Sequence, residues 1–344
     1  MRPFPYVRKI LSLILIFLVI CNFSWKKTEE RDPFLYFLAY GVLIKVDPVG
    51  RELSTIGFFH PTAPAVARAA DGLFWARIDE KHMGAMNPET GRIEARVQLS
   101  QRPYTHIIIP DGKAYITHHT LTHEGFMVSV VNTRKKRVEK EIKHINGLRT
   151  DLIYHDPYVY LAAIGVKEND YLYLYRIDTK RDRLEEMYRE PLAEYVWRMA
   201  AKNDLIYLCH INRGAYESVP IVEVFATSTR KIVKTFTLSD SGIAKVIGRI
   251  ELEGERLLVP CITERETLGI AFIDIQNGEV EKIFPLQGKP YRILGTRRET
   301  LVYIDNPMDK GREGVSLYFF DLEVGREVII VNIPKFIEQQ LKTQ

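Results

Sequence analysis

Apolar and polar positions follow one pattern that repeats along most of the chain. An apolar run leads into a short polar residue, then Gly, Lys or Arg follows three or four residues later, and a second apolar run begins. This order is typical of a β-hairpin, in which two strands flank a polar turn. The turns are spaced 40 to 48 residues apart and centre on Asp47, Asn87, Asn132, Asp178, Ala226, Asp274 and Asp321. A period in this range is typical of propeller arrays.

A second recurring pattern of two apolar segments around a turn follows the hairpins, and the turn reads Asp-Gly at residues 71–72 and 111–112 and Asn-Asp at residues 203–204. Each repeat therefore predicts four short antiparallel strands, which is the make-up of a propeller blade. Six complete units fit between residues 64 and 331, and residues 35–56 supply only the later strands of another unit. We predict an all-β propeller of seven four-stranded blades. Residues 333–337 are expected to add the missing first strand and close the ring.

The region from about residue 34 onward resembles YVTN-type β-propeller repeats. The best copy is residues 103–138, which reads Pro-Asp-Gly-Lys-Ala-Tyr-Ile-Thr and then Val-Ser-Val-Val-Asn-Thr. His118 stands where the phrase of the family usually has Asn. The resemblance implies a secreted or surface-layer propeller. It does not specify a function, because one scaffold carries binding, structural and enzymatic roles.

The first 33 residues differ from the repeats. Basic residues precede the apolar run 10–20, which is the pattern of an export signal. No Ala-x-Ala site follows, and this favours an uncleaved anchor whose charged end stays in the cytoplasm. The alternative is a lipoprotein, because residues 18–21 resemble a lipobox that ends at Cys21, although Ile20 replaces the small residue expected there.

These patterns divide the chain into residues 1–33, a signal-anchor or signal peptide, and residues 34–344, the propeller. We expect the N-terminal segment to hold the propeller at the membrane of the cell envelope, outside the cytoplasm. A secreted protein and a lipoprotein stay open as alternatives. The net charge of +4 is small beside 48 basic and 44 acidic residues, so the composition gives no reason to expect a nucleic-acid partner. Cys209 and Cys261 lie one blade apart, and we expect two buried thiols.

Charged side chains recur on the strands that are expected to line the central channel. When the units are aligned on the Asp-Gly turn, the middle of the inner strands contains Val66, His106, Asp151, Arg198 and Arg249, and Arg292 falls nearby if one residue of slip is allowed. Arginine suits carboxylate and phosphate groups because its planar guanidinium donates two parallel hydrogen bonds. The sequence therefore predicts an anion-binding channel, with structural Arg–Asp pairing as the alternative.

Two functions fit this arrangement. The first is a binding or scaffold module that takes a protein or an anionic ligand at one face of the propeller. The second is a lactonase-like or lyase-like enzyme for an anionic small molecule. In that enzyme His106 would be the general base, and Arg198 and Arg249 would hold the developing negative charge. The sequence contains no P-loop, Gly-x-Ser-x-Gly or His-Glu-x-x-His motif, so we favour the binding module.

Three histidines, His118, His119 and His123, lie close together in the sequence. Neighbouring residues of a strand point to opposite faces, so we interpret them as exposed loop residues and expect no metal site and no cofactor. Candidate binding loops are residues 118–125, 210–220 and 304–314. Tyrosines recur at one position of the repeat and predict packing between blades: Tyr115, Tyr160, Tyr207 and Tyr303.

Overall fold

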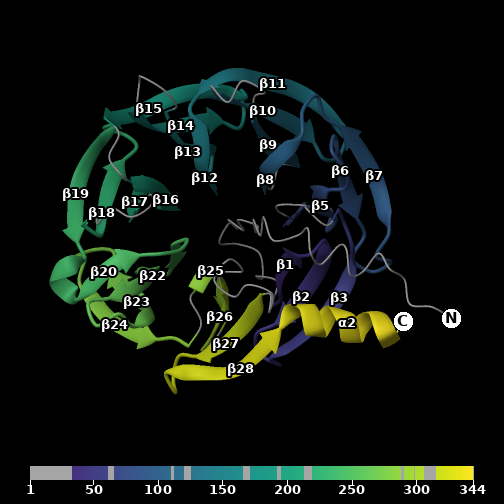
Figure 1. Cartoon of the computed structure of the whole chain (residues 1–344). Coiled ribbons are helices and arrows are strands. Elements are labelled where there is room, and N and C mark those ends of the chain that lie inside the picture. The colour runs from purple at the N-terminus through teal and green to yellow at the C-terminus, as the bar shows by residue number, and fades with distance from the viewer. Residues whose placement is uncertain are drawn as a thin grey trace.

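The computed structural model describes residues 33–60, 66–109, 112–119, 125–165, 171–191, 195–212, 219–287, 290–297, 299–305 and 315–343. These residues form seven antiparallel sheets arranged as a ring (Figure 1), so the predicted seven-bladed all-β propeller is confirmed. In blades 2 to 7 the first strand lies nearest the centre and the last strand lies at the rim (Figure 1).

Blade 1 contains β1 (Leu35–Ala39), β2 (Val42–Asp47) and β3 (Glu52–Phe58). Blade 2 contains β4 (Val66–Arg68), β5 (Phe74–Arg77), β6 (His82–Met86) and β7 (Ile93–Gln98). Blade 3 contains β8 (Pro103–Ile109), β9 (Lys113–His119), β10 (Gly125–Asn132) and β11 (Arg137–Asn146). Blade 4 contains β12 (Leu148–His155), β13 (Tyr158–Ile164), β14 (Tyr171–Asp178) and β15 (Arg183–Pro191).

Blade 5 contains β16 (Tyr195–Lys202), β17 (Leu205–Asn212), β18 (Ile221–Ala226) and β19 (Lys231–Thr237). Blade 6 contains β20 (Ile243–Val246), β21 (Glu251–Glu253), β22 (Arg256–Thr263), β23 (Leu268–Asp274) and β24 (Val280–Pro285), and the short η1 (Ser239–Ser241) precedes it. Its inner position is shared by β20 and β21, which both pair with β22. Blade 7 contains β25 (Pro290–Arg297), β26 (Thr300–Asp305), β27 (Ser316–Asp321) and β28 (Arg326–Asn332).

The repeated polar residue closes the turn between the last two strands of a blade. In blade 6, Asp274 Oδ1 accepts hydrogen bonds from the backbone N–H groups of Gln276 and Asn277, at 2.7 and 3.1 Å. A short carboxylate or amide side chain can reach backbone groups two or three residues ahead, which stabilises the turn locally. The same bonds are made by Asp47, Asn87, Asp178 and Asp321.

The hairpin turn of blade 5 lacks a local acceptor for its backbone N–H groups, because Ala226 has no side-chain oxygen. Asp204, in the turn between β16 and β17, reaches across to this hairpin turn. Its Oδ2 atom accepts the N–H of Ser228 at 3.2 Å, its Oδ1 atom accepts the hydroxyl of Thr227, and its carbonyl accepts the N–H of Thr227 at 2.9 Å. A residue from the neighbouring turn therefore replaces the missing local acceptor.

The hydrophobic core is divided into seven clusters, and each fills the space between two neighbouring blades. The four recurrent tyrosines are buried in these clusters, so the prediction of packing between blades is confirmed. Three of them have hydroxyl partners: Tyr115 donates to Asp182 Oδ1 at 2.6 Å, Tyr303 donates to Glu327 Oε1 at 2.8 Å, and Tyr160 bonds to Thr227. A buried tyrosine hydroxyl needs such a partner.

The chain ends do not pair as predicted. Residues 333–337 begin α2 (Ile333–Thr343) and add no strand, so blade 1 has three strands. Asn332 caps the helix, because its Oδ1 accepts the N–H of Lys335 at 3.0 Å, and Pro334 lies in the first turn, where no N–H is needed. The helix cap at Asn332 therefore makes this short apolar run a helix, although its pattern also fits a strand.

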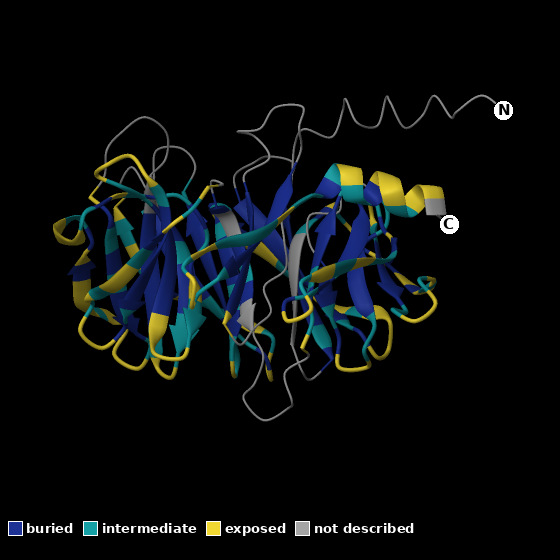
Figure 2. Cartoon of the chain, turned by 90° about the horizontal axis from the view of Figure 1, so that it is seen from below, coloured by how far each residue is buried: buried dark blue, intermediate teal, exposed yellow. Residues whose placement is uncertain are grey.

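The ring is closed by side-chain packing. Phe37 and Ile44 of blade 1 pack against residues of blade 7, and Ile333 and Ile337 of α2 join the same cluster. At the rim, Arg51 Nη2 bonds to Asp321 Oδ2 at 2.7 Å and links the hairpin turns of the two blades. Helix α2 lies at one end of the ring, and many exposed turns gather at the opposite end (Figure 2).

The N-terminal prediction falls almost entirely outside the described residues, because Cys21 and the rest of residues 1–32 are not among them. In the part of the chain that the structure describes, no helix is long and apolar enough to cross a membrane.

Candidate functional site

A cluster of charged side chains forms where the inner strands of successive blades converge. Arg149 and Asp151 come from β12, Arg198 comes from β16, and Arg249 lies between β20 and β21. Arg249 Nη2 lies 3.8 Å from Asp151 Oδ1. Blades 4 and 6 are separated by blade 5, so this contact is made only near the axis of the ring (Figure 1). We name Arg149, Arg198 and Arg249 the arginine cluster.

Both carboxylate oxygens of Asp151 accept hydrogen bonds from backbone N–H groups. Its Oδ1 accepts the N–H of Leu152 and its Oδ2 accepts the N–H of Met199, both at 2.9 Å. The second bond ties β12 to β16, and the residue is 3% exposed. A buried carboxylate needs such donors to offset the loss of water. Asp151 is therefore a structural bridge that also supplies a negative charge beside the arginine cluster.

Arg149 is the most unusual member of the cluster. It is 8% exposed, and within the described part of the chain its Nε and Nη1 atoms have no hydrogen-bond partner. The ring of Tyr104 from β8 lies against the guanidinium, 5.0 Å from its central carbon. Burial, and then the charge of Arg249, lower the pKa of Arg149 to about 10. A guanidinium retains its charge at neutral pH even so.

A β-bulge shapes this position. The pairing of β12 with β13 shifts between Arg149 and Asp151, and the pairing of β8 with β9 shifts between Pro103 and Thr105. A bulge inserts an extra residue and re-aims the neighbouring side chains. In β12 the extra residue is Thr150, whose carbonyl accepts a hydrogen bond from Arg198 Nη1. The two bulges thus bring Tyr104 and Arg149 together from neighbouring blades.

The structure brings together some of the residues that the sequence predicted to line the middle of the channel, and it separates others. Asp151, Arg198 and Arg249 do come together. Val66 does not belong with them, because it is fully buried in the core between blades 1 and 2. His106 and Arg292 lie on β8 and β25, but their side chains are outside the described part of the structure. The acid–base role of His106 therefore stays a prediction.

Sequence reasoning missed Arg149 and Tyr104. The alignment on the Asp-Gly turn considered one position in the middle of each inner strand, and both residues lie nearer the strand start. The two-residue spacing between Arg149 and Asp151 follows the alternation of a regular strand, but the bulge at Thr150 interrupts that alternation. The bulge has no marker in this sequence, such as a glycine at the extra position, so the sequence could not have placed Arg149 reliably.

The histidine motif is not the exposed group that we expected. His118 lies on β9 and is fully buried, with Nε2 2.9 Å from Ser129 Oγ on β10. The expectation of an exposed loop is therefore wrong for this residue. The side chain of His119 and the whole of His123 are outside the described residues, as are most residues of the three candidate binding loops. Cys209 and Cys261 are buried free thiols, as expected.

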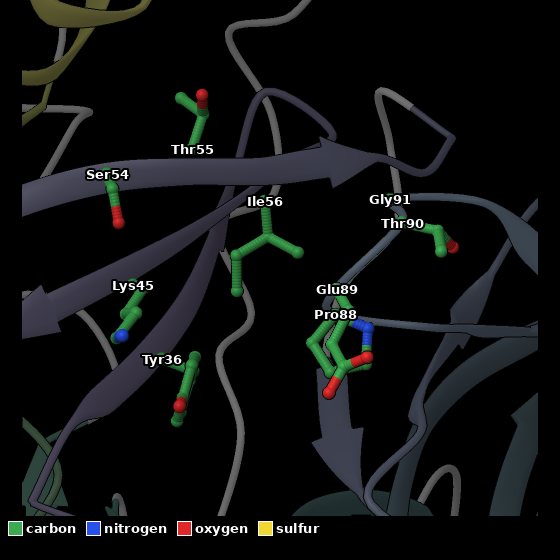
Figure 3. Close-up of a pocket in the computed structure, with 9 residues that line it drawn as sticks. All are labelled: Tyr36, Lys45, Ser54, Thr55, Ile56, Pro88, Glu89, Thr90 and Gly91. Atoms are coloured by element: carbon green, nitrogen blue, oxygen red, sulfur yellow. The ribbon is translucent and has the colours of Figure 1, made fainter.

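A polar cavity of about 440 Å³ lies between blades 1 and 2 (Figure 3). Tyr36, Lys45 and Ser54 of blade 1 face Pro88 and Glu89 of the β6–β7 turn across it. The Lys45 amine already lies 3.4 Å from the centre of the Phe34 ring, and Glu89 is exposed. Lys45 and Glu89 carry opposite charges and the cavity is open, so it is a weaker candidate for a ligand site than the arginine cluster.

The fold and this site together define a seven-bladed propeller with a partly buried cationic cluster near its axis. No family model matches the sequence, and no curated protein matches it. Solved propellers resemble it in structure. The computationally designed Ika8 protein is 10% identical with a TM-score of 0.59, and the match covers 91% of this chain and 86% of that chain.

Two natural proteins give similar matches. Dihydro-heme d1 dehydrogenase NirN, solved in complex with DHE, is 14% identical with a TM-score of 0.59, over 90% of this chain and 66% of that chain. BamB from Moraxella catarrhalis is 12% identical with a TM-score of 0.54, over 85% of this chain and 80% of that chain. At these identities the likeness shows the propeller fold alone.

Proposed function

We propose that this propeller is a binding module for a small anionic ligand, held by the arginine cluster. One observation carries the proposal: Arg149 is buried and charged, yet two of its donor atoms have no partner among the described residues. A buried charge whose hydrogen-bond donors are unfilled is costly, and strongly perturbed charges cluster at binding and catalytic sites. A carboxylate, sulfate or phosphate oxygen supplies the acceptors that Arg149 lacks.

Structural pairing of arginine with aspartate does not balance the charge of the arginine cluster. The cluster contains three guanidinium groups, and among the main charges that act on Arg149 the carboxylate is that of Asp151. Both Asp151 oxygens accept backbone N–H groups, and the 3.8 Å contact with Arg249 is too long for a hydrogen bond. The cluster therefore retains a positive surplus that suits an anion with one or two charges.

A ligand screen on the full-length chain tests the proposal. The unfolding temperature is measured with sulfate, phosphate, a sugar acid and, as the neutral control, a sugar. A ligand that binds only the native state stabilises it, by about 2.7 kcal/mol at one hundred times its dissociation constant. We expect a saturable increase with anions, none with the neutral sugar, and no anion effect in Arg149→Met. An equal anion effect in that variant would contradict the site.

We further propose that residues 1–33 export the chain and hold the propeller at the membrane of the cell envelope. The support is the basic start, the apolar run 10–20 and the lack of an Ala-x-Ala site after that run. Fractionation of cells that express the full chain tests this. Membrane-bound protein that resists carbonate and is unchanged by Cys21→Ser supports an uncleaved anchor. Release by Cys21→Ser supports lipidation, and recovery from the cytosol contradicts export.

A further inference from the structure

A second group of ligand-type side chains lies between blades 4 and 5, and none of its members belongs to the arginine cluster. Glu190 belongs to the end of β15, His210 to β17 and Glu223 to β18. One nitrogen of the histidine and one oxygen of each carboxylate lie within 4.8 Å of one another. The three residues are 20 and 13 positions apart in sequence, so only the fold brings them together.

The sheet pairing explains how two of them meet. In blade 5 the register pairs Cys209 with Val222, so His210 and Glu223 are diagonal neighbours on the opposite face of the sheet. Leu208, on the same face as His210, belongs to the core cluster shared with blade 4. This face therefore presents His210 and Glu223 to the blade that carries Glu190.

The group is largely shielded from water. The His210 side chain is 2% exposed and the Glu223 side chain is 15% exposed, and the His210 Nε2 atom lies 2.9 Å from Glu223 Oε2. The Tyr188 hydroxyl donates to Glu190 Oε2 at 3.2 Å, which orients that carboxylate from behind.

We propose that Glu190, His210 and Glu223 bind one divalent transition-metal cation, such as Zn²⁺. Two carboxylates close together in a shielded position repel each other, and a divalent cation between them removes that repulsion. An imidazole nitrogen with two carboxylate oxygens is a donor set that Zn²⁺ and its neighbours in the transition series accept. Ca²⁺ and Mg²⁺ prefer oxygen ligands throughout, so they fit this set less well.

The geometry needs only a small adjustment. Zinc–nitrogen and zinc–oxygen bonds of about 2.0 to 2.2 Å place neighbouring tetrahedral ligands about 3.4 Å apart. The His210–Glu223 pair opens slightly from 2.9 Å, and Glu190 closes toward it from within 4.8 Å. Glu190 is the second-last residue of β15 and is half-buried, so it is placed to make that movement. The bound cation would then join blades 4 and 5 at one end of the ring.

Cobalt is the probe that reports both binding and ligand geometry. The untagged full-length chain is freed of metal with a chelator and titrated with Co²⁺, and its visible absorption is recorded. We expect bands of a four- or five-coordinate Co²⁺ ion that saturate at one equivalent and are displaced by Zn²⁺. Zn²⁺ should raise the unfolding temperature by several degrees, whereas Ca²⁺ and Mg²⁺ should not. Absence of stoichiometric Co²⁺ binding would overturn the proposal and leave the group as an ion-pair network.

Matched variants locate the site. His210→Gln and Glu223→Gln should abolish the cobalt bands and the Zn²⁺ stabilisation. Glu190→Gln, at a less buried position, should weaken Co²⁺ binding at least tenfold and serves if the buried variants fail to fold. His155→Gln and Glu186→Gln are the controls, because both residues bind other partners in blades 4 and 5. Unchanged Co²⁺ affinity in folded Glu190→Gln and Glu223→Gln would place the metal elsewhere and contradict the assignment.

Discussion

Arg149 carries a charge at a buried position, so a substitution can separate its effect on stability from its effect on binding. Arg149→Met keeps much of the side-chain volume and removes the charge. Replacing a buried charge by an apolar side chain of similar size is often neutral or stabilising, by roughly 1 to 4 kcal/mol. We therefore expect the free energy of unfolding of Arg149→Met, measured by chemical denaturation, to equal or exceed that of the wild type.

The control for this comparison is Arg176→Met in the same blade. Arg176 Nη2 bonds to Glu185 Oε2 at 2.8 Å and its guanidinium covers the ring of Tyr158, so its loss removes partners and should not stabilise the fold. A loss of about 2 kcal/mol or more in Arg149→Met would show that Arg149 serves the fold, and the binding account would lose its main support.

The lowered pKa of Arg149 predicts a pH dependence of anion binding. Burial disfavours the charged form in the folded state, so its pKa falls from its usual high value to about 10. Below that pH Arg149 is charged in both states, and the full penalty on stability is present. The penalty is relieved as pH rises above about 10 toward the pKa of the unfolded chain, because the folded chain releases the proton first. An anion that binds only the charged form of Arg149 is released over the same rise in pH.

The measurement is the increase in unfolding temperature caused by sulfate, recorded from about pH 7 to about pH 11. Sulfate remains a dianion throughout, so a change in its effect reports on the protein. We expect the increase to diminish as pH passes about 10. Arg149→Met should show no increase at any pH. A sulfate effect in the wild type that stays constant across the range would contradict a role for the Arg149 charge.

The hairpin turn of blade 5 depends on Asp204, a residue outside the turn. Asp204→Ala removes the acceptor of the Ser228 N–H and of the Thr227 hydroxyl, and we expect a loss of about 1 kcal/mol. Adding Ala226→Asp should restore stability, because it recreates the local turn seen at Asp274. Thermal or chemical denaturation of the single and double variants measures this. Equal stability of the single and double variants would refute the exchange of acceptors.

Helix α2 is predicted to support the closure of the ring. Ile337 is 9% exposed and packs in the cluster between blades 1 and 7, so Ile337→Ala should destabilise the chain by about 2 kcal/mol or more. Leu341 on the same helix is 50% exposed, and Leu341→Ala is the matched control with an expected effect below about 0.5 kcal/mol. Equal effects of both substitutions would show that α2 does not contribute to the closure.

The same helix shows which kind of signal was overlooked in the sequence. The apolar residues 333–337 fit a strand as well as one face of a helix, and the repeat favoured the strand. Asn332 followed by Pro334 is the start signal of a helix, and this local signal decided the outcome. Capping depends on residues next to each other, so it could have been predicted from the sequence.

The blade count was predictable because its cause is local and repeated. Each Asp or Asn binds backbone groups two or three residues ahead, so every copy of the turn leaves the same mark in the sequence. The arginine cluster has a different origin. Tyr104, Arg149, Arg198 and Arg249 come from four successive blades, and their meeting depends on bulges and on the convergence of inner strands. Repeat alignment therefore found part of this site and missed its most buried member.

A crystal structure of the full-length chain with selenate tests whether the ring holds an anion against Arg149. Selenate replaces sulfate, and the anomalous signal of selenium locates it without ambiguity. We expect one strong anomalous peak within hydrogen-bond distance of Arg149 Nε or Nη1, near Arg198 and Arg249. Peaks confined to surface lysines and arginines, with none at the arginine cluster, would contradict the claim and leave Arg149 as a structural charge.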